Sequence, residues 1–164
     1  MKLIPLGNNH FTQVSDSQYP RLSKFKWRLM KTHENYSIVI RNFQVNKKIY
    51  YCIMSRFILS APDGKLVDHI DGNPLNNQNE NLRLCTNAEN CRNTKIYKNN
   101  TSGYKGVQSI GKQGKWFAII NCNRKQKYIG TFETKEEAAM AYNEYAKKLH
   151  GEFARLNVIP TKSV

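Results

Sequence analysis

The sequence predicts an α+β chain made of two small domains. Runs of β-branched and aromatic residues alternate with turn residues along most of the chain, which is typical of short strands. Two later stretches are each followed by a Thr-x-x-Glu pattern that opens a helix. The length of 164 residues suits one or two domains with cores of modest size.

The first sixty residues form a β-rich region with short helices. Asp16 is expected to cap a brief helix. Residues 36–43 and 48–54 are β-branched and aromatic runs, which predict a hairpin. Residues 55–62 predict one or two helical turns, because a proline and an Asp-Gly pair stop the apolar stretch.

Residues 65–98 predict a strand, a loop, a second strand and a helix. The strands are expected at 65–70 and 81–85, on either side of a turn rich in asparagine. Thr86 and Glu89 match a capping box and predict a helix over about 87–97.

The last third of the chain predicts a small sheet followed by one helix. Residues 97–103 are polar and are the best linker candidate. Three strands are expected at 104–109, 115–121 and 125–130. A second capping box at Thr134 opens a helix that glycine closes after Leu149.

The chain is strongly basic. It has 26 lysines and arginines against 12 aspartates and glutamates, a formal net charge of +14 that is spread over the whole sequence. A charge of this size favours a polyanionic partner and makes its binding sensitive to salt. No apolar stretch approaches the roughly 18 residues of a membrane span, so no membrane partner is expected.

The four cysteines do not predict a metal site. They stand at positions 52, 85, 91 and 122, without a C-x-x-C pair and without histidines at zinc-finger spacing. No structural zinc is therefore expected. Free thiols in a reducing compartment are the favoured interpretation, and a disulfide between Cys85 and Cys91 stays open as an alternative.

Asp68 and His69 stand side by side at the end of the first strand of the 65–98 segment. A carboxylate and an amide oxygen suit a hard divalent ion that keeps several water ligands, and Asn90 lies one helical turn after its cap to supply the amide. The imidazole of His69 suits a general base near neutral pH. Asn81 opens the second strand, where it is expected to orient that ring. Each residue alone is more often a turn or surface residue, and the combination is what indicates a site.

The stretches DHIDGN, ENLR and the asparagines that follow closely resemble the HNH family of endonucleases. The resemblance implies a ββα-metal fold with His69 as the general base and Asn81 as the residue that orients it. It also implies that Asp68 and Asn90 are the ligands of one Mg²⁺ or Mn²⁺ ion. Asn90 replaces the histidine of many members, as in phage homing members, and Asn93 is the alternative second ligand.

A second resemblance divides the chain into domains at 1–98, with the nuclease core at 65–98, and at 101–157. The segments YKGV, GKW, YIGTFETKEEAAMAY and HGEFARLN closely resemble the Apetala-two, or ethylene-responsive-factor, DNA-binding domain. That family folds as a three-stranded antiparallel sheet backed by one helix. Its outer sheet face enters the major groove of DNA.

Seven residues of this chain match the DNA-contacting face of that family. They are expected on strands or in turns: Lys105, Gln108, Lys115, Phe117, Arg124, Lys125 and Tyr128. Plant members place arginines on this face. Arginine recognises guanine with two parallel hydrogen bonds, whereas lysine is a point charge. The lysines and arginine are therefore expected to contact mostly phosphates, and base specificity is not carried over from the family.

Together these features predict a site-directed DNA endonuclease of the homing type, which hydrolyses phosphodiester bonds of double-stranded DNA. The expected compartment is the cytoplasm of a phage-infected bacterial host. The sequence does not identify protein partners, a target sequence or an oligomeric state. A non-catalytic, sequence-specific DNA-binding protein with a degenerate nuclease site is the alternative, and an RNA-directed or structure-specific nuclease is a third hypothesis.

Overall fold

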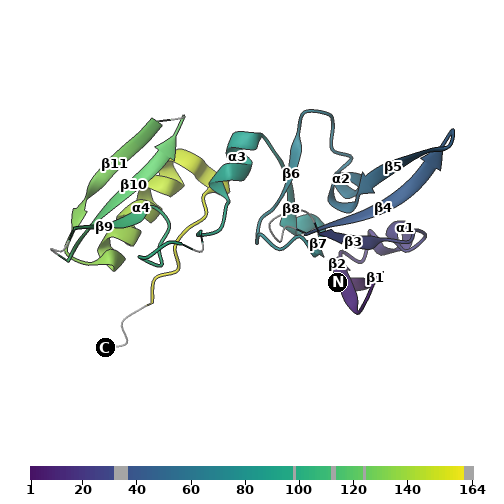
Figure 1. Ribbon diagram of the computed structural model, residues 1–164, viewed down its shortest axis with the longest axis horizontal. Helices are drawn as coiled ribbons and strands as arrows, with labels where there is room; N and C mark the ends of the chain where they lie inside the picture. The colour runs from purple at the N-terminus through teal and green to yellow at the C-terminus, as the bar shows by residue number, and fades with distance from the viewer. Residues whose placement is uncertain (32–36, 98, 112–113, 124, 161–164) are drawn as a thin grey trace. The chain divides into compact units, whose positions relative to one another are not determined.

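The computed structural model describes residues 1–31, 37–97, 99–111, 114–123 and 125–160. The chain forms two compact units, Met1–Asn90 and Cys91–Val164. Each unit surrounds its own hydrophobic core. Small sheets and short helices make up the first unit, and a sheet backed by one long helix makes up the second (Figure 1). The predicted α+β class is confirmed.

The first unit begins with a β-hairpin. Strands β1 (Lys2–Gly7) and β2 (His10–Val14) pair antiparallel across Asn8 and Asn9, which both have positive φ. Asparagine tolerates this left-handed conformation better than most residues other than glycine. β2 also pairs in parallel with β7 (Asn76–Asn77), so one sheet joins the start of the chain to the asparagine-rich loop.

The brief helix expected after Asp16 is α1 (Tyr19–Leu22), but Asp16 does not cap it. Gln18 stands at the N-cap position. Pro20 lies in the first turn, where its fixed φ favours a helix start, and no side chain caps this start. The Asp16 carboxylate instead lies 3.0 Å from the N-terminal ammonium group of Met1.

The predicted hairpin is confirmed within a three-stranded antiparallel sheet of β3 (Arg28–Lys31), β4 (Ser37–Val45) and β5 (Lys48–Ile53). Its turn is only Asn46 and Lys47, both with positive φ, and β4 therefore extends past residue 43. The expected short helix is α2 (Met54–Leu59), which ends at Ser60 in the left-handed conformation.

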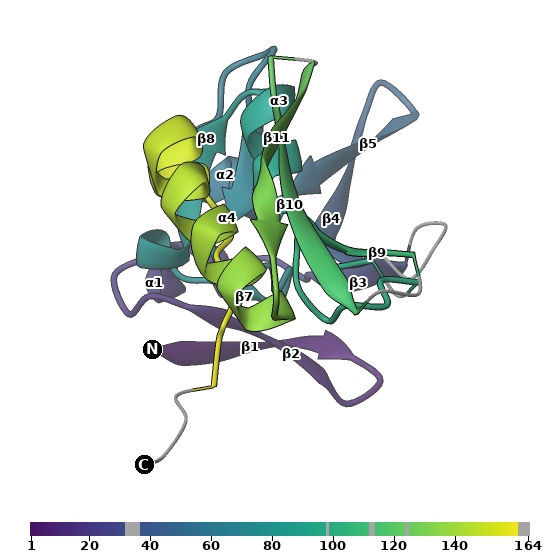
Figure 2. The same ribbon diagram turned by 90° about the vertical axis from the view of Figure 1, so that its left-hand side faces the viewer.

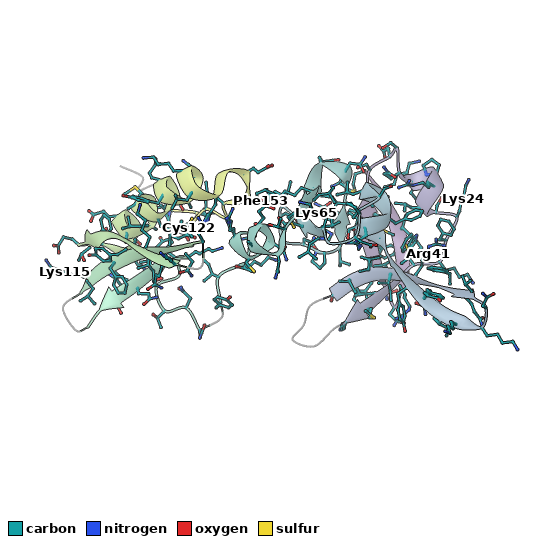
Figure 3. All side chains as sticks on the ribbon, turned by 90° about the horizontal axis from the view of Figure 1, so that it is seen from above. Lys24, Arg41, Lys65, Lys115, Cys122 and Phe153 are labelled. Atoms are coloured by element: carbon teal, nitrogen blue, oxygen red, sulfur yellow. The ribbon has the colours of Figure 1, made fainter. Side chains whose placement is uncertain are left out.

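Aromatic residues of the first unit surround one arginine. The rings of Phe25, Trp27 and Phe57 pack together, with centroids 5.9–6.3 Å apart. The guanidinium carbon of Arg41, labelled in Figure 3, lies 3.8 Å from the Phe25 centroid. A desolvated cation–π contact contributes about 2 kcal/mol, so Arg41 ties the β4–β5 hairpin to the core.

The asparagine-rich motif folds as the predicted strand, loop, strand and helix: β6 (Leu66–His69), the loop with β7 and the short 3-10 helix η2 (Asn79–Asn81), β8 (Leu82–Cys85) and α3 (Asn87–Arg92). β6 and β8 pair antiparallel. The predicted capping box is confirmed. The Thr86 amide donates to the Glu89 carboxylate at 2.7 Å, and the Glu89 amide donates to the Thr86 hydroxyl at 3.3 Å.

Helix α3 ends at Arg92, earlier than the predicted residue 97. The Thr94 hydroxyl donates to the carbonyl of Cys91 at 2.7 Å. The Lys105 ammonium donates to the carbonyls of Arg92 and Thr94, at 2.6 and 2.9 Å. Burial lowers the pKa of Lys105 to about 8. These donors satisfy carbonyls that helix termini leave without intrahelical partners, and the helix ends there.

The second unit is the predicted three-stranded sheet with one helix. Its antiparallel strands are β9 (Val107–Ile110), β10 (Lys115–Cys122) and β11 (Lys125–Phe132), with β10 in the middle. Helix α4 (Lys135–His150) opens with the predicted Thr134 capping box, closes at Gly151 and leads into the 3-10 helix η3 (Gly151–Phe153). Figure 2 shows α4 alongside β10 and β11. The predicted linker, residues 97–103, lies within this unit, where Ser102 is buried.

Strand β9 begins at Val107 rather than at residue 104 because of Gly106. This glycine has a φ of 74°, and its carbonyl accepts a 2.8 Å hydrogen bond from the Ile119 amide. A Cβ atom at Gly106 would clash with the ring of Tyr142 and with the carbonyl oxygen of Ile119. Only glycine fits both the conformation and the space.

In the part of the chain that the structure describes, no helix is long and apolar enough to cross a membrane.

Gly106→Ala is predicted to destabilise the second unit by about 3 kcal/mol, the sum of a left-handed backbone penalty and an overpacking penalty. Gly103→Ala is the matched control, because Gly103 has a similar φ of 78° with open space around its Cβ position. It is expected to lose only about 1 kcal/mol. Urea unfolding of the full chain measures both, and equal losses would show that the Tyr142 contact does not matter.

Lys105→Met is predicted to lower the free energy of unfolding by about 1 kcal/mol, because two carbonyls lose a charged donor while the aliphatic stem is kept. Lys125→Met is the control, since Lys125 is exposed at the start of β11. Thermal unfolding and a DNA-binding titration of both variants separate the two possible uses of Lys105. A loss of DNA affinity without a loss of stability would assign Lys105 to DNA instead.

Candidate functional site

The end of strand β6 carries a buried ion pair. Asp68 is 6% exposed and lies opposite Arg83 in the β6–β8 pair. The guanidinium of Arg83 donates to Oδ2 from Nε at 2.9 Å and from Nη2 at 2.7 Å. A buried carboxylate needs a partner of this kind, because removing one charge of such a pair costs several kcal/mol. Arg83 thus holds the Asp68 carboxylate in one orientation.

His69 is the next residue, half-buried at the mouth of the asparagine-rich loop. Its Nε2 lies 3.3 Å from the side-chain oxygen of Asn77. Burial lowers the pKa of His69, and the Asn77 contact and the charges of Asp71 and Asp68 oppose this by raising it. The net lowering favours the neutral imidazole, which is the form that accepts a proton.

The loop after β6 is organised by side-chain amides. The Asp71 carboxylate accepts from the Asn73 backbone at 2.7 Å and from the Asn76 side chain at 2.8 Å. Gly72, with a φ of 69°, donates its amide to the carbonyl of His69 and turns the chain sharply. Partial burial acts to raise the pKa of Asp71, but the hydrogen bonds from these asparagines and from Asn81 lower it.

Asn81, predicted to orient the imidazole of His69, binds the loop. Its side-chain oxygen accepts from the Asp71 amide at 3.0 Å, and its Nδ2 donates to the Asp71 carboxylate at 3.0 Å and to the carbonyl of Asn76 at 2.7 Å. Asn81 is also 8% exposed. That Asn81 orients the imidazole stays a prediction. These contacts suggest that it would act indirectly, by fixing the loop that follows His69.

Asn77 is the residue that the sequence analysis missed. It contacts the His69 ring and is 1% exposed. In the sequence it is one of five asparagines between positions 73 and 81, all of which suit turns. The sequence places Asn77 eight residues after His69, which does not distinguish it from its neighbours. Its burial follows from the pairing of β2 with β7, for which the sequence contains no local pattern.

Asn90, the predicted second metal ligand, is half-buried on α3 and is the last residue of the first unit. Its amide donates to the carbonyl of Thr86 at 3.0 Å, which confirms that it lies one turn after the cap. Asn93, the alternative ligand, follows the end of α3 and is 8% exposed. Asn93 belongs to the second unit and Asp68 to the first, so the choice between the two amides stays open.

The donor chemistry fits a hard divalent ion. In the residues that the structure describes, no three His, Cys, Asp or Glu side chains gather into a group that could hold a metal. One carboxylate and one amide oxygen, from Asp68 and Asn90, suit an ion such as Mg²⁺ that keeps most of its water ligands. Cys85 and Cys91 are both free thiols, so the alternative of a disulfide between them is wrong.

The second unit presents one open sheet face. Ala118 and Ile120 of β10 are buried against α4, so the alternating residues face away from it. On that outer face Phe117 pairs with Gln108 of β9. The rings of Phe117 and Tyr128 lie 6.4 Å apart, and Tyr128 is 59% exposed. The predicted contact residues Gln108, Phe117 and Tyr128 therefore form one cluster on this face, in which Gln108 and Tyr128 are exposed and Phe117 is half-buried.

The predicted basic contacts differ in their surroundings. Lys125 is exposed on β11. Lys115 is exposed and pairs with Glu133 at 2.9 Å. The ammonium of Lys105 is engaged inside its unit, on the carbonyls of Arg92 and Thr94. Arg124 lies outside the described residues.

Comparisons with known proteins match these two regions. Residues 60–92 match the family model described as HNH endonuclease, and residues 102–152 match the AP2 domain. Protein 3.8 of Escherichia phage T7 is 40% identical over 57% of this chain and 77% of its own length. Dehydration-responsive element-binding protein 2D of Arabidopsis thaliana is 47% identical over 34% of this chain and 27% of its own. No solved structure matches.

Similarity also spans both regions at once. An HNH endonuclease of Acanthamoeba polyphaga mimivirus, named as uncharacterized, is 37% identical over 96% of this chain and 80% of its own length. An HNH motif and an AP2 domain in one chain support double-stranded DNA as its partner. The chain belongs to the HNH endonuclease family and carries an AP2 domain.

Proposed function

We propose that the chain is a site-directed, metal-dependent DNA endonuclease of the homing type. The observation that carries the proposal is the pair of side chains at the end of β6. Asp68 is buried and held by Arg83, while His69 has a lowered pKa and an amide contact to its ring. A fixed carboxylate beside a neutral imidazole suits metal-assisted hydrolysis of a phosphodiester, in which the carboxylate binds the metal and the imidazole takes a proton from water.

In this proposal His69 takes the proton from the attacking water. Burial supports this role, because it keeps the imidazole neutral at pH values where an exposed histidine is partly charged. Asp68 and Asn90 would hold one Mg²⁺ or Mn²⁺ ion, which when bound stabilises negative charge on the phosphate and on the leaving oxygen. Arg83 keeps the Asp68 carboxylate oriented, and the loop bonds of Asn81 keep His69 at the entrance of the loop.

The AP2 domain would deliver this site to DNA. A sheet face fits the major groove, and the cluster of Gln108, Phe117 and Tyr128 lies on the open face. Lys115 and Lys125 would contact phosphates, which position the protein without reading sequence. One catalytic site per chain cuts one strand in each binding event, so a double-strand break needs a second chain or a second event.

The homing type is supported by relatives from a phage and from a virus, and a phage-infected bacterial host by the phage relative. The Asn90 amide at the second ligand position is supported by its place one turn after the Thr86 cap.

A DNA-binding protein with a degenerate nuclease site is the second candidate. The observation that favours it is the Arg83 guanidinium on Asp68, because a fixed positive charge beside the expected ligand opposes the binding of a cation. The HNH endonuclease match at residues 60–92 weighs the other way, so the endonuclease is favoured.

His69→Ala is predicted to lower the rate of plasmid cleavage with Mg²⁺ by at least about 100-fold, because the general base is lost. DNA affinity is expected to stay within about twofold, since His69 is not part of the outer sheet face. His10→Ala is the control, as His10 is an exposed histidine of the same unit. Equal cutting by the wild type and His69→Ala would exclude the mechanism. Duplex DNA, branched DNA and RNA substrates in the same assay separate the nuclease classes.

Tyr128→Ala is predicted to weaken DNA binding by about 10-fold without loss of stability, because the ring is exposed and offers a contact surface of roughly 1–2 kcal/mol. Met140→Ala is the matched control, since Met140 is 50% exposed on α4, on the other side of the unit. Fluorescence anisotropy with labelled duplex DNA measures both affinities. A larger loss for Met140→Ala would place the DNA contact on the helix instead of on the sheet.

A further inference from the structure

A buried amide connects the first strands of the chain to His69. Asn77 is 1% exposed and Thr12, on β2, is fully buried. The Asn77 Nδ2 lies 2.9 Å from the Thr12 hydroxyl and 3.1 Å from the carbonyl oxygen of Pro74. The Asn77 oxygen Oδ1 lies 3.3 Å from Nε2 of His69.

The contacts of the Asn77 amide allow only one orientation. The carbonyl of Pro74 can only accept a hydrogen bond, so the amide atom beside it must be the nitrogen. The single hydroxyl proton of Thr12 is directed at the carbonyl of Leu75, at 2.8 Å, which also can only accept. Thr12 therefore accepts from Asn77, and both partners require Nδ2 at the same position.

The orientation of the amide determines the proton position on the imidazole. With Nδ2 bound to Thr12 and Pro74, the atom that faces His69 is Oδ1, which can only accept. The neutral ring must then carry its proton on Nε2, and the lone pair that accepts a proton is on Nδ1. The network thus selects both the tautomer and the direction of the ring.

We propose that Asn77 is the positioning residue of His69 and that Thr12 holds Asn77 in place. The N-terminal hairpin is part of this hydrogen-bond network, because the parallel pairing of β2 with β7 brings Thr12 beside the loop. Asn81, by contrast, binds Asp71 and Asn76 and sets the path of the loop. The catalytic consequence of this proposal rests on the proposed nuclease function, whereas the tautomer does not.

The first experiment observes the ring directly, without metal or DNA. In the ¹⁵N-labelled full chain at about pH 8, where the imidazole is neutral, His69 is expected to show a protonated Nε2 whose proton exchanges slowly with water. In Asn77→Ala that proton is expected to exchange rapidly. Asn76→Ala is the matched control, because the Asn76 amide binds Asp71 and Gln78, and it is expected to keep the slow proton.

The second experiment measures single-turnover DNA cleavage with Mg²⁺. Asn77→Ala is expected to lower the cleavage rate by about 10- to 100-fold with DNA affinity within about twofold, because the base is misaligned but present. Thr12→Val, which removes the hydroxyl at nearly constant volume, is expected to lose rate in the same direction, and Thr12→Ser is expected to recover it. Circular dichroism establishes folding, and the Thr12 variants decide the matter if Asn77→Ala does not fold.

The outcomes separate the two proposals. A wild-type His69 protonated on Nδ1, or an Asn77→Ala variant that keeps both the slow Nε2 proton and the full rate, overturns the positioning role. Loss of rate in Asn77→Ala together with an equal loss in Asn76→Ala also overturns it, since the effect would then belong to the loop as a whole. A wild type that does not cut, but shows the protected Nε2 proton that Asn77→Ala loses, refutes the nuclease and supports the positioning.

Discussion

The arrangement of the candidate site depends on how the backbone of the asparagine-rich loop is bound. The loop between β6 and β8 contains little regular structure that could pair its own amides and carbonyls, and buried backbone groups must be paired somewhere. Part of the solution is external. The carbonyl of Leu75 accepts from the Gln13 amide at 2.8 Å and from the Thr12 hydroxyl at 2.8 Å. The N-terminal hairpin is therefore a structural component of the site and not a separate element.

The side chains of the loop asparagines make many of the remaining hydrogen bonds. Asn73 and Asn76 bind within the turn, to Leu75 and Asp71. Asn81 ties the two ends of the loop together, and its carbonyl accepts from the Ile70 amide at 2.9 Å. Asn77 is the most buried of them, at 1% exposed, and its amide bridges the hairpin and the imidazole. One residue type thus fulfils three tasks, which depend on where the loop places each amide.

This division explains what the sequence could predict. The β4–β5 hairpin, both capping boxes and the Asp68–His69 strand end are signalled by residues near one another in the chain, and the structure contains them. The pairing of β2 with β7 and the use of Lys105 on helix carbonyls depend on contacts with no local pattern. Asn77 could not be told from its neighbours for the same reason, because its burial follows from the long-range pairing and not from the sequence around it.

The formal charge of +14 also needs the structure for its interpretation. Several cations are already bound to groups of the protein: Arg41 lies on aromatic rings, Arg83 on Asp68 and Lys105 on backbone carbonyls. The guanidinium of Arg56 likewise donates to the carbonyls of Ala61, Pro62 and Lys65.

Such residues stabilise the fold, and their donors are not available to phosphates without breaking those bonds. The salt dependence of DNA binding reports the number of phosphates neutralised and not the number of basic residues. The slope of affinity against salt should therefore be smaller than a count of lysines and arginines implies. Lys125 is exposed and accounts for more of that slope than the engaged cations, because its ammonium group breaks no internal bond of the described residues to reach a phosphate.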